Sequence, residues 1–226
     1  IEFILELNVS DKQVVEAKNI IAVILAAGES SRFGSPKQLA DWHGKPLLQH
    51  VFDTVSQVFP KTWVMLGANY KEINSVLSFG VAKVLHESAW QEGMGKVIAS
   101  AASSAESEAL LTDENVDGLL FLLGDQPLIE TSDLRKYCTL VNEQANEIIC
   151  AGYQEEDKEL SLGVPAYFPW SYLPQLKGLA VPGNQGGAKG IILRNKTTPV
   201  YLGGRVQDVD TESDLERLRL AVTSVC

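Results

Sequence analysis

The sequence has few of the residues that build disulfide frameworks or metal clusters. Three cysteines and three histidines are spread over 226 residues, at Cys138, Cys150, Cys226, His43, His50 and His86. None of them shows the short spacing of a zinc site or a redox motif, and scattered cysteines are typical of free thiols in a reducing compartment. We therefore expect a cytoplasmic protein without a structural disulfide.

Long apolar runs and an excess of positive charge are also missing. No apolar stretch approaches the ~20 residues that cross a bilayer. The chain starts at Ile1 rather than Met, which suggests an incomplete or processed start, and no signal-peptide pattern follows. The 19 Lys and Arg against 29 Asp and Glu give a formal net charge of -10, the wrong sign for nucleic acid. We expect neither a membrane nor a nucleic acid as partner.

What the chain does have is alternating strand and helix patterns and 45% hydrophobic residues, enough for a substantial core. This alternation predicts one α/β domain with a doubly wound, mostly parallel sheet. Residues 1–18 are expected to form an N-terminal extension of unknown role, and residues 19–226 the functional domain. Hairpin and loop insertions are expected in the C-terminal half, with a polar hairpin tip at residues 155–159. The expected strands are 20–25, 62–66, 81–85, 118–123 and 148–153, and the expected helices are 46–58, 70–77, 95–107, 131–145 and 211–221.

The stretch around which the chain is organised covers residues 19–38. It begins with an apolar, Val/Ile-rich run at 20–25 that predicts a strand buried on both faces. A loop of Ala, Gly and Ser follows, whose N–H groups can point at an anion and in which Gly28 permits positive φ values. Two cations, Arg32 and Lys37, come within nine residues of Gly28. Together these features indicate a polyphosphate site.

Two common phosphate loops do not fit the spacing. The P-loop needs four residues between its glycines and then Lys-Ser/Thr, whereas five residues separate Gly28 from Gly34. The dinucleotide fingerprint G-x-G-x-x-G fails directly after Gly28. What remains is the pattern L-A-A-G-x-S-x-R-x-G-x-x-K, which resembles the signature loop of nucleotidyltransferases with a sugar-nucleotide-pyrophosphorylase-like fold. Its fixed positions are Leu25, Ala26, Ala27, Gly28, Ser30, Arg32, Gly34 and Lys37.

Two acidic residues follow at the ends of other expected elements. Asp125 comes just after an apolar strand, and Asp210 directly precedes a capped helix. Each alone also fits an ordinary role, Asp125 in a strand-end turn and Asp210 in helix capping. A triphosphate brings Mg²⁺, which takes one or two protein carboxylates besides phosphate oxygens and water. We therefore predict that Asp125 and Asp210 hold Mg²⁺, while Arg32 and Lys37 act as catalytic cations at the phosphates.

The order of these motifs carries a more specific resemblance. From about Ile20 to Leu220 the chain resembles the molybdenum cofactor cytidylyltransferase family, a branch of the MobA-like NTP transferases. The resemblance implies a Rossmann-like fold, CTP, Mg²⁺, and transfer of CMP to the terminal phosphate of molybdopterin, with a molybdoenzyme or its chaperone as a further partner. It also places Gly95 and Asp125 at the nucleotide, beside Leu25, Ala26, Ala27, Gly28, Ser30, Arg32 and Lys37. The Ala26-Ala27 pair looks more like the cytidylyl than the guanylyl branch.

The chain departs from the family mainly on the expected acceptor side. Lys96 and Val97 replace serines, Val164 replaces histidine, and the segment 183–189 has Asn and Lys where the family has Asp and Arg. A sugar or polyol phosphate therefore remains an alternative acceptor, and a non-catalytic cofactor-binding or delivery module remains an alternative role. A dinucleotide oxidoreductase is disfavoured because the glycine fingerprint is absent.

Overall fold

The computed structural model describes residues 19–153, 160–181 and 187–223. The N-terminal extension and the hairpin tip expected at 155–159 lie outside the described residues, as do most of the segment 183–189 and Cys226. Within the described part of the chain, no helix has both the length and the apolar character needed to cross a membrane.

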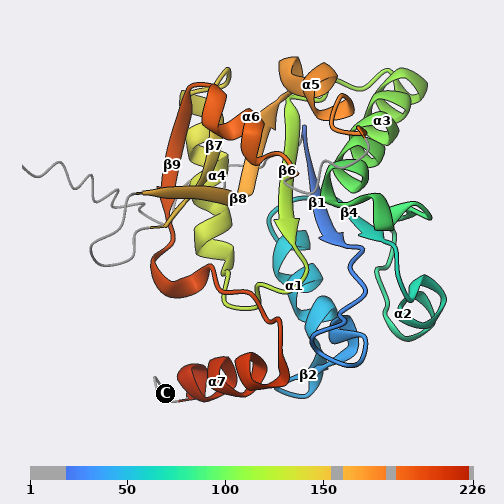
Figure 1. Ribbon diagram of the computed structural model, residues 1–226. Coiled ribbons are helices and arrows are strands. Elements are labelled where there is room, and N and C mark those ends of the chain that lie inside the picture. Colours follow the sequence, from blue (N-terminus) through green and yellow to red (C-terminus); the bar gives the residue numbers. More distant parts are fainter. Residues whose placement is uncertain (1–18, 154–159, 182–186, 224–226) are drawn as a thin grey trace, which may run out of the picture.

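A seven-stranded sheet forms the centre of the molecule (Figure 1). Six of its strands run parallel to one another, and β8 is antiparallel to both of its neighbours, β6 and β7. The sheet is therefore mostly parallel, which confirms the predicted α/β architecture. In spatial order the strands are β5 (Lys83–His86), β4 (Lys61–Leu66), β1 (Ile20–Ala26), β6 (Gly118–Leu123), β8 (Ser161–Pro169), β7 (Ile148–Tyr153) and β9 (Thr197–Tyr201).

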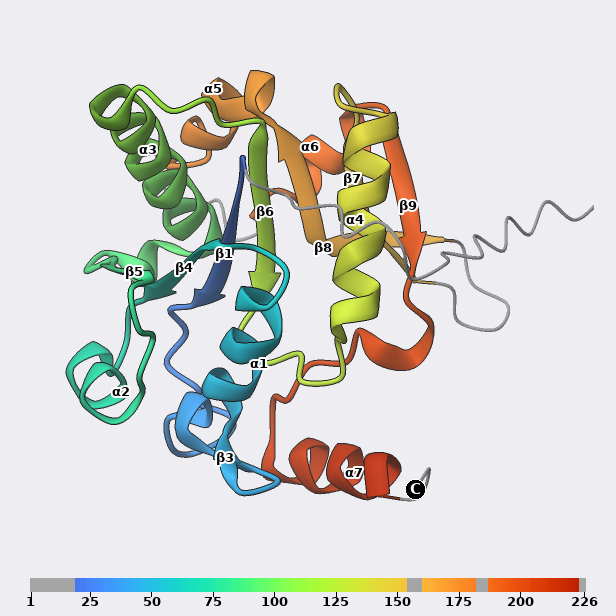
Figure 2. The ribbon, with the colours of Figure 1, turned by 180° about the vertical axis from the view of Figure 1, so that it is seen from behind.

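Helices cover both faces of this sheet. The face shown toward the viewer in Figure 2 carries α1 (Leu47–Ser56) and α4 (Thr131–Glu143). The other face carries α3 (Met94–Thr112), α5 (Leu173–Lys177) and α6 (Lys189–Arg194). Strand β1 is buried along its whole length because its alternate residues enter two separate cores, Ile20, Ala22 and Ile24 on the α1 side and Ile21, Val23 and Leu25 on the α3 side.

A small third core joins the region after β1 to the C-terminal helix α7 (Glu212–Thr223). The residues of this core are Phe33, Trp42, Leu47, Val209, Leu215 and Leu218. A two-stranded hairpin, β2 (Asp41–Trp42) and β3 (Lys45–Pro46), contributes to it, and its turn residues have φ values of 51° and 84°. The run Trp42-His43-Gly44-Lys45-Pro46 predicts a turn, and positive φ at both central positions, the geometry of tight hairpin turns, confirms it.

Several sequence predictions need correction. The polar run Thr131-Ser132-Asp133 predicts an N-cap within it, but the capping residue of α4 is Glu130, which forms a reciprocal capping box with Asp133. Likewise Pro46 precedes α1 as its N-cap instead of occupying the first helical position. Both differences shift a boundary by one residue and leave the elements in place.

The larger difference lies between residues 165 and 201. Hairpin and loop material was expected here. Strand β8 pairs antiparallel with β7, as a hairpin does, but it continues to Pro169, and the short helices η3 (Trp170–Tyr172), α5 and α6 stand where loop was expected. Strand β9, which the sequence did not predict, pairs with β7 at the edge of the sheet. Pro199 interrupts its pattern, and an edge strand tolerates proline because one side needs no ladder partner. Pairing with β7 therefore outweighs the tendency of Pro199 to interrupt a strand.

The topology fixes where a ligand can bind. The chain passes from β1 to β4 and β5 on one side, and β6 then joins the opposite side of β1. In open α/β sheets the crevice for a ligand lies beyond the carboxyl ends of the strands at such a reversal. The loop after β1 and the turn after β6 both begin there, because β1 and β6 are parallel neighbours.

Candidate functional site

The loop after β1 presents free backbone donors at this crevice. Residue Ser30 adopts a left-handed conformation with φ 63°, and its carbonyl accepts the N–H groups of Phe33 and Gly34 at 2.9 and 3.1 Å. Among the described residues, no acceptor takes a hydrogen bond from the N–H of Gly28 or Glu29. Such unpaired N–H groups in a turn of mixed handedness form a cradle for an anion.

An open depression lies over this loop. Its volume of about 370 Å³ falls within the range of small-molecule sites. Most of the wall comes from the loop after β1, and one residue comes from the turn that follows β4. The lining residues are Glu29, Ser30, Ser31, Gly34, Ser35, Pro36 and Asn69.

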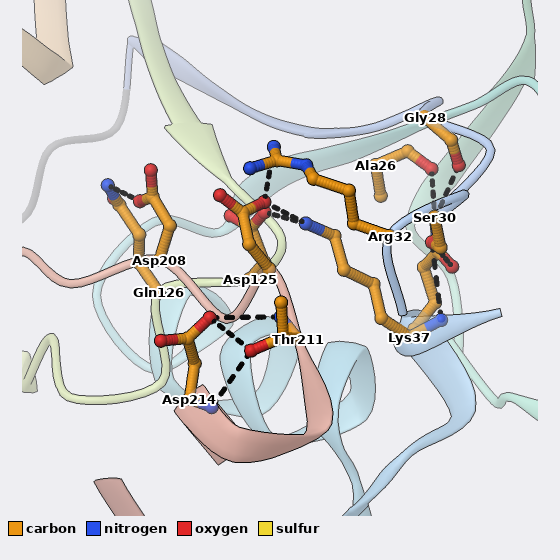
Figure 3. Close-up of polar contacts among 12 residues, drawn as sticks. Ala26, Gly28, Ser30, Arg32, Lys37, Asp125, Gln126, Asp208, Thr211 and Asp214 are labelled. Atoms are coloured by element: carbon orange, nitrogen blue, oxygen red, sulfur yellow. Dashed lines mark hydrogen bonds and ion pairs between the residues drawn. The ribbon is translucent and has the colours of Figure 1, made fainter. Parts of the chain in front are cut away.

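Beside the loop, Lys37 joins the two predicted carboxylates. Its Nζ lies 2.5 Å from Asp125 Oδ2 and 3.3 Å from Asp210 Oδ1, and Nη2 of Arg32 lies 3.0 Å from the same Asp210 oxygen (Figure 3). Burial alone would lower the pKa of Lys37, but the charges and hydrogen bonds of Asp125 and Asp210 outweigh it and raise that pKa above its ordinary value. The lysine is therefore a firmly protonated cation between two acids.

The Asp125 side chain is mostly buried, and in the described part of the chain only one of its two carboxylate oxygens has a partner. Its Oδ1 has no hydrogen-bond partner among the described residues, while Oδ2 contacts Lys37. Burial raises the pKa of Asp125, the contact with Lys37 opposes this shift, and the nearby charges of Asp208 and Asp210 add to it. A buried acceptor without a partner is costly, so the free oxygen marks a place for a cation or a donor from outside.

The segment that carries Asp210 is tied to the turn that carries Asp125. The Val209 N–H donates to the Asp125 carbonyl at 2.9 Å, and Gln126 Nε2 donates to Asp208 Oδ1 at 2.9 Å. Directly after Asp210, Thr211 and Asp214 form a reciprocal cap at the start of α7, with N···O distances of 3.0 and 3.2 Å (Figure 3). The sequence prediction that a cap opens this helix is thus confirmed.

A second anchor lies further up the same segment, which begins with the short helix η4 (Gly203–Arg205). The guanidinium of Arg205 binds both carboxylate oxygens of Asp133, with Nε–Oδ2 at 2.7 Å and Nη2–Oδ1 at 3.1 Å. The carboxylate of Asp133 is fully buried, and two-pronged pairs of this kind hold a defined geometry. This contact fixes the chain before Asp208 to the start of α4.

The donor set fits one kind of metal site and excludes another. Among the described residues, no group of three or more His, Cys, Asp or Glu side chains is placed to hold an ion. The carboxylates of Asp125 and Asp210, both in reach of one Lys37 nitrogen, suit Mg²⁺ or Mn²⁺ that takes its other ligands from phosphate and water. They do not suit a closed site built from protein ligands alone.

The other predicted site residues are distributed as follows. The ends of β1, Leu25 and Ala26, are buried, and Gly124 approaches so closely that an added Cβ would lie 3.0 Å from the Cβ of Ala26. Residue Gly95 is buried in the first turn of α3 and makes none of the polar contacts of the Lys37 cluster.

Sequence reasoning missed three residues at or near this centre. Gln38, Asp208 and Arg205 hold the loop and the Asp210 segment by side-chain hydrogen bonds. Arg205 and Asp133 are 72 positions apart in the chain, so no local pattern pairs them. For Gln38, the sequence offered one indication of a role in the site, namely a polar residue directly after the lysine of the loop motif.

Comparisons with known proteins show the family of this chain. The model of the MobA-like NTP transferase domain matches residues 22–198. The bifunctional protein GlmU of Desulfitobacterium hafniense is 38% identical over 117 residues, which cover 50% of this chain and 24% of that relative's length.

Solved structures share the fold across nearly the whole chain. Rv0371c from Mycobacterium tuberculosis, solved in complex with manganese, superposes with a TM-score of 0.67 at 24% identity, covering 90% of this chain and 100% of that one. A CMP:2-keto-3-deoxy-manno-octonic acid synthetase complexed with CTP gives 0.66 at 19% identity, with coverage of 92% and 100%. With its sheet, its loop after β1 and the family match over most of its length, the chain belongs to the MobA-like NTP transferase domain family.

Proposed function

We propose that this protein is a nucleotidyltransferase that transfers CMP from CTP to a phosphate-bearing acceptor and releases pyrophosphate. One observation carries the proposal: the loop with free N–H groups, the Lys37 cation and two carboxylates converge at the reversal point of the sheet. Phosphoryl-type transfer depends mainly on positioning and on neutralising charge, and this arrangement provides both.

In this proposal each residue has a separate task. The N–H groups of Gly28 and Glu29 bind phosphate oxygens, and the buried end of β1 at Leu25 and Ala26, with Ala27 directly after it, limits how deeply the nucleotide enters. When the triphosphate arrives, Lys37 and Arg32 exchange carboxylate partners for phosphate oxygens. No general base is required because the acceptor phosphate is already a nucleophile.

The residues that would hold Mg²⁺ are Asp125 and Asp210. The ion, when bound, neutralises charge on the reacting phosphoryl group. The unpartnered Oδ1 of Asp125 and the exposed side of Asp210 are the oxygens available to it. Rv0371c, which shares the fold, was solved in complex with manganese, and this supports a test with a divalent ion.

The acceptor is proposed to be the terminal phosphate of molybdopterin, on the strength of the motif order. A sugar or polyol phosphate is the second candidate, because the CTP-bound synthetase with the same fold is named for a sugar acid. The replacements Lys96, Val97 and Val164 lie on the expected acceptor side and also favour testing this alternative. A molybdoenzyme or its chaperone remains a predicted partner only under the first acceptor.

Two broader predictions accompany the proposal. We infer that residues 19–226 work as one functional domain, supported by a single sheet with cores on both faces. A cytoplasmic location stays a prediction, supported by the free thiols of Cys138 and Cys150.

The test is thermal stabilisation by each of the four nucleoside triphosphates, with and without Mg²⁺, for the wild type and Asp125→Asn. A ligand that binds only the folded state raises the melting temperature. We expect the largest Mg²⁺-dependent rise with CTP, and its loss in the variant. No rise with any triphosphate would overturn the proposal.

A pyrophosphate-release assay then separates the acceptors. Molybdopterin and a hexose 1-phosphate are compared at equal concentrations with CTP. Release with the sugar phosphate alone would transfer the proposal to the second candidate. Nucleotide binding without release for any phosphate acceptor would favour the non-catalytic binding module.

A further inference from the structure

The Gln38 side chain is a buried polar group at the back of the nucleotide loop. It belongs to the short helix η1 (Lys37–Leu39), and only 3% of its surface is exposed. Its Nε2 donates to the carbonyl oxygens of Ala26 and Gly28, both at 3.1 Å, and its Oε1 accepts the hydroxyl of Ser30 at 3.2 Å. One side chain therefore fixes three successive parts of the loop, and dashed lines in Figure 3 run from Ala26 and Gly28 to a common point beside Ser30.

These contacts determine where the loop donors point. In a trans peptide unit the C=O of one residue and the N–H of the next point in opposite directions. Since the Gly28 carbonyl faces Gln38, the N–H of Glu29 faces away from it, on the side of the depression that Glu29 and Ser30 line. The hydrogen bond at the rear of the loop thus orients a free donor at the front.

The same network reaches Lys37 through Ser30. The Ser30 hydroxyl donates to Gln38 and accepts the backbone N–H of Lys37 at 3.3 Å. Left-handed backbone costs a non-glycine residue about 1 kcal/mol, so Ser30 keeps its φ of 63° only because surrounding contacts hold it. Gln38 is therefore connected to both the phosphate cradle and the lysine that bridges the carboxylates.

We propose that Gln38 is a positioning residue for triphosphate binding: it orients the loop N–H groups and Lys37 without touching the nucleotide. The inference rests on the proposed function, because it names the residue that prepares the same site. Preorganised donors bind more tightly than donors that must be ordered on binding. Loss of Gln38 should accordingly weaken nucleotide affinity in protein that is fully folded.

The chain supplies a matched control in Gln49. This residue of α1 also makes three hydrogen bonds, to Asp53 Oδ1 at 2.8 Å and to the Ser78 carbonyl and N–H at 2.9 Å each. It ties down a loop before β5 that takes no part in the nucleotide depression. Gln38→Met and Gln49→Met therefore remove equal numbers of hydrogen bonds at one site and away from it.

The experiment is titration calorimetry with CTP and Mg²⁺, below the melting temperature of every variant. For Gln38→Met we expect the dissociation constant to rise roughly 10-fold or more, as when a supporting hydrogen-bond partner is lost, and for Gln49→Met to stay within about twofold. Amide exchange of the free protein should accelerate at Phe33, Gly34 and Lys37, whose N–H groups donate to Ser30, and it should do so in Gln38→Met alone.

Two further outcomes separate the inference from the proposed function. If Gln38→Met lowers the melting temperature yet binds CTP as the wild type does, Gln38 is only a structural residue, and the inference is wrong while the function stands. If the wild type itself binds no triphosphate, the proposed function fails and the inference falls with it. A double variant with Ser30→Ala adds a check, because two residues of one network should have non-additive effects on affinity.

Discussion

The two carboxylates of the candidate site are held in different ways. Asp125 follows β6 directly, so its place is set by a central strand that pairs on both sides. Asp210 lies in a segment outside the sheet, fixed by the Arg205–Asp133 pair, the Gln126–Asp208 bond and the packing of Val209. The sheet therefore sets the geometry of the first half of the site, at Asp125. The second half, at Asp210, depends on long-range side-chain contacts. The first half should therefore resist perturbation of its surroundings better than the second.

The largest expected effect comes from removing one carboxylate at a time. Asp125→Asn should slow pyrophosphate release roughly 1000-fold and Asp210→Asn roughly 100-fold, judged from the loss of one preorganised electrostatic group. The difference follows from burial, because the Asp210 side chain is 33% exposed against 17% for Asp125, and water can partly replace it. Initial rates at saturating CTP measure both losses.

Asp208→Asn is the control for that comparison. It neutralises a neighbouring acid that contacts Gln126 but neither Lys37 nor Arg32. Its rate should stay within about tenfold of the wild type, since it removes no group at the phosphates. Equal losses in Asp208→Asn and Asp210→Asn would show that general charge, and not the position of Asp210, governs the rate.

The anchor of the second half can be broken on its own. Arg205→Met should lower the free energy of unfolding by about 2 kcal/mol, because hydrogen bonds to a charged group are lost and the buried Asp133 keeps only Lys136 as a cationic partner among the described residues. Urea unfolding measures the change. Arg217→Met, which removes exposed contacts to Gln207 and Asp214, should cost less than about 1 kcal/mol. An equal loss in both variants would argue against a dedicated anchor.

Lys37 stands between the halves and can be used to separate them. Its ammonium lies beside both carboxylates, so Lys37→Met should raise the affinity for Mn²⁺ alone by roughly tenfold through loss of a like charge. Electron paramagnetic resonance of free Mn²⁺ gives the affinity. Lys45→Met, which instead removes the ion pair between Lys45 and Asp53 away from the site, should leave the Mn²⁺ affinity unchanged. Unchanged Mn²⁺ affinity in Lys37→Met would mean that the ion binds elsewhere.

The smallest expected effect concerns pH and the turn after β6. Burial lowers the pKa of His50 below its ordinary 6.5; its bond to the Pro127 carbonyl opposes the shift, and Lys45, Asp53 and His43 also face it. Below about pH 6.5, His50 therefore takes up a proton more readily in the unfolded chain than in the folded one. The free energy of unfolding consequently falls as the pH drops.

Melting temperatures between pH 7.5 and pH 5.5 test this dependence. His50→Gln, which keeps a donor but cannot titrate, should flatten the part of the profile near pH 6, by less than about 1 kcal/mol. An unchanged profile in the variant would assign the pH dependence to other groups.

The sequence by itself determined much of the first half of the molecule. Apolar runs determined β1 and β6 because strands buried on both faces have no polar positions, and the glycine and serine loop with Arg32 and Lys37 predicts a phosphate site. The prediction that Asp125 and Asp210 form a pair also agrees with their common contact to Lys37, although their role with a metal stays a prediction.

Only the tertiary structure decided the rest. It gave β8 and β9 their places in the sheet despite Pro165, Pro169 and Pro199, since ladder partners from distant segments replace local propensity. It also brought Arg205 to Asp133 and turned Gln38 toward the loop carbonyls. Periodicity records which faces of an element are buried. It does not indicate which distant side chain will contact a buried polar group, because that contact forms only when the elements pack.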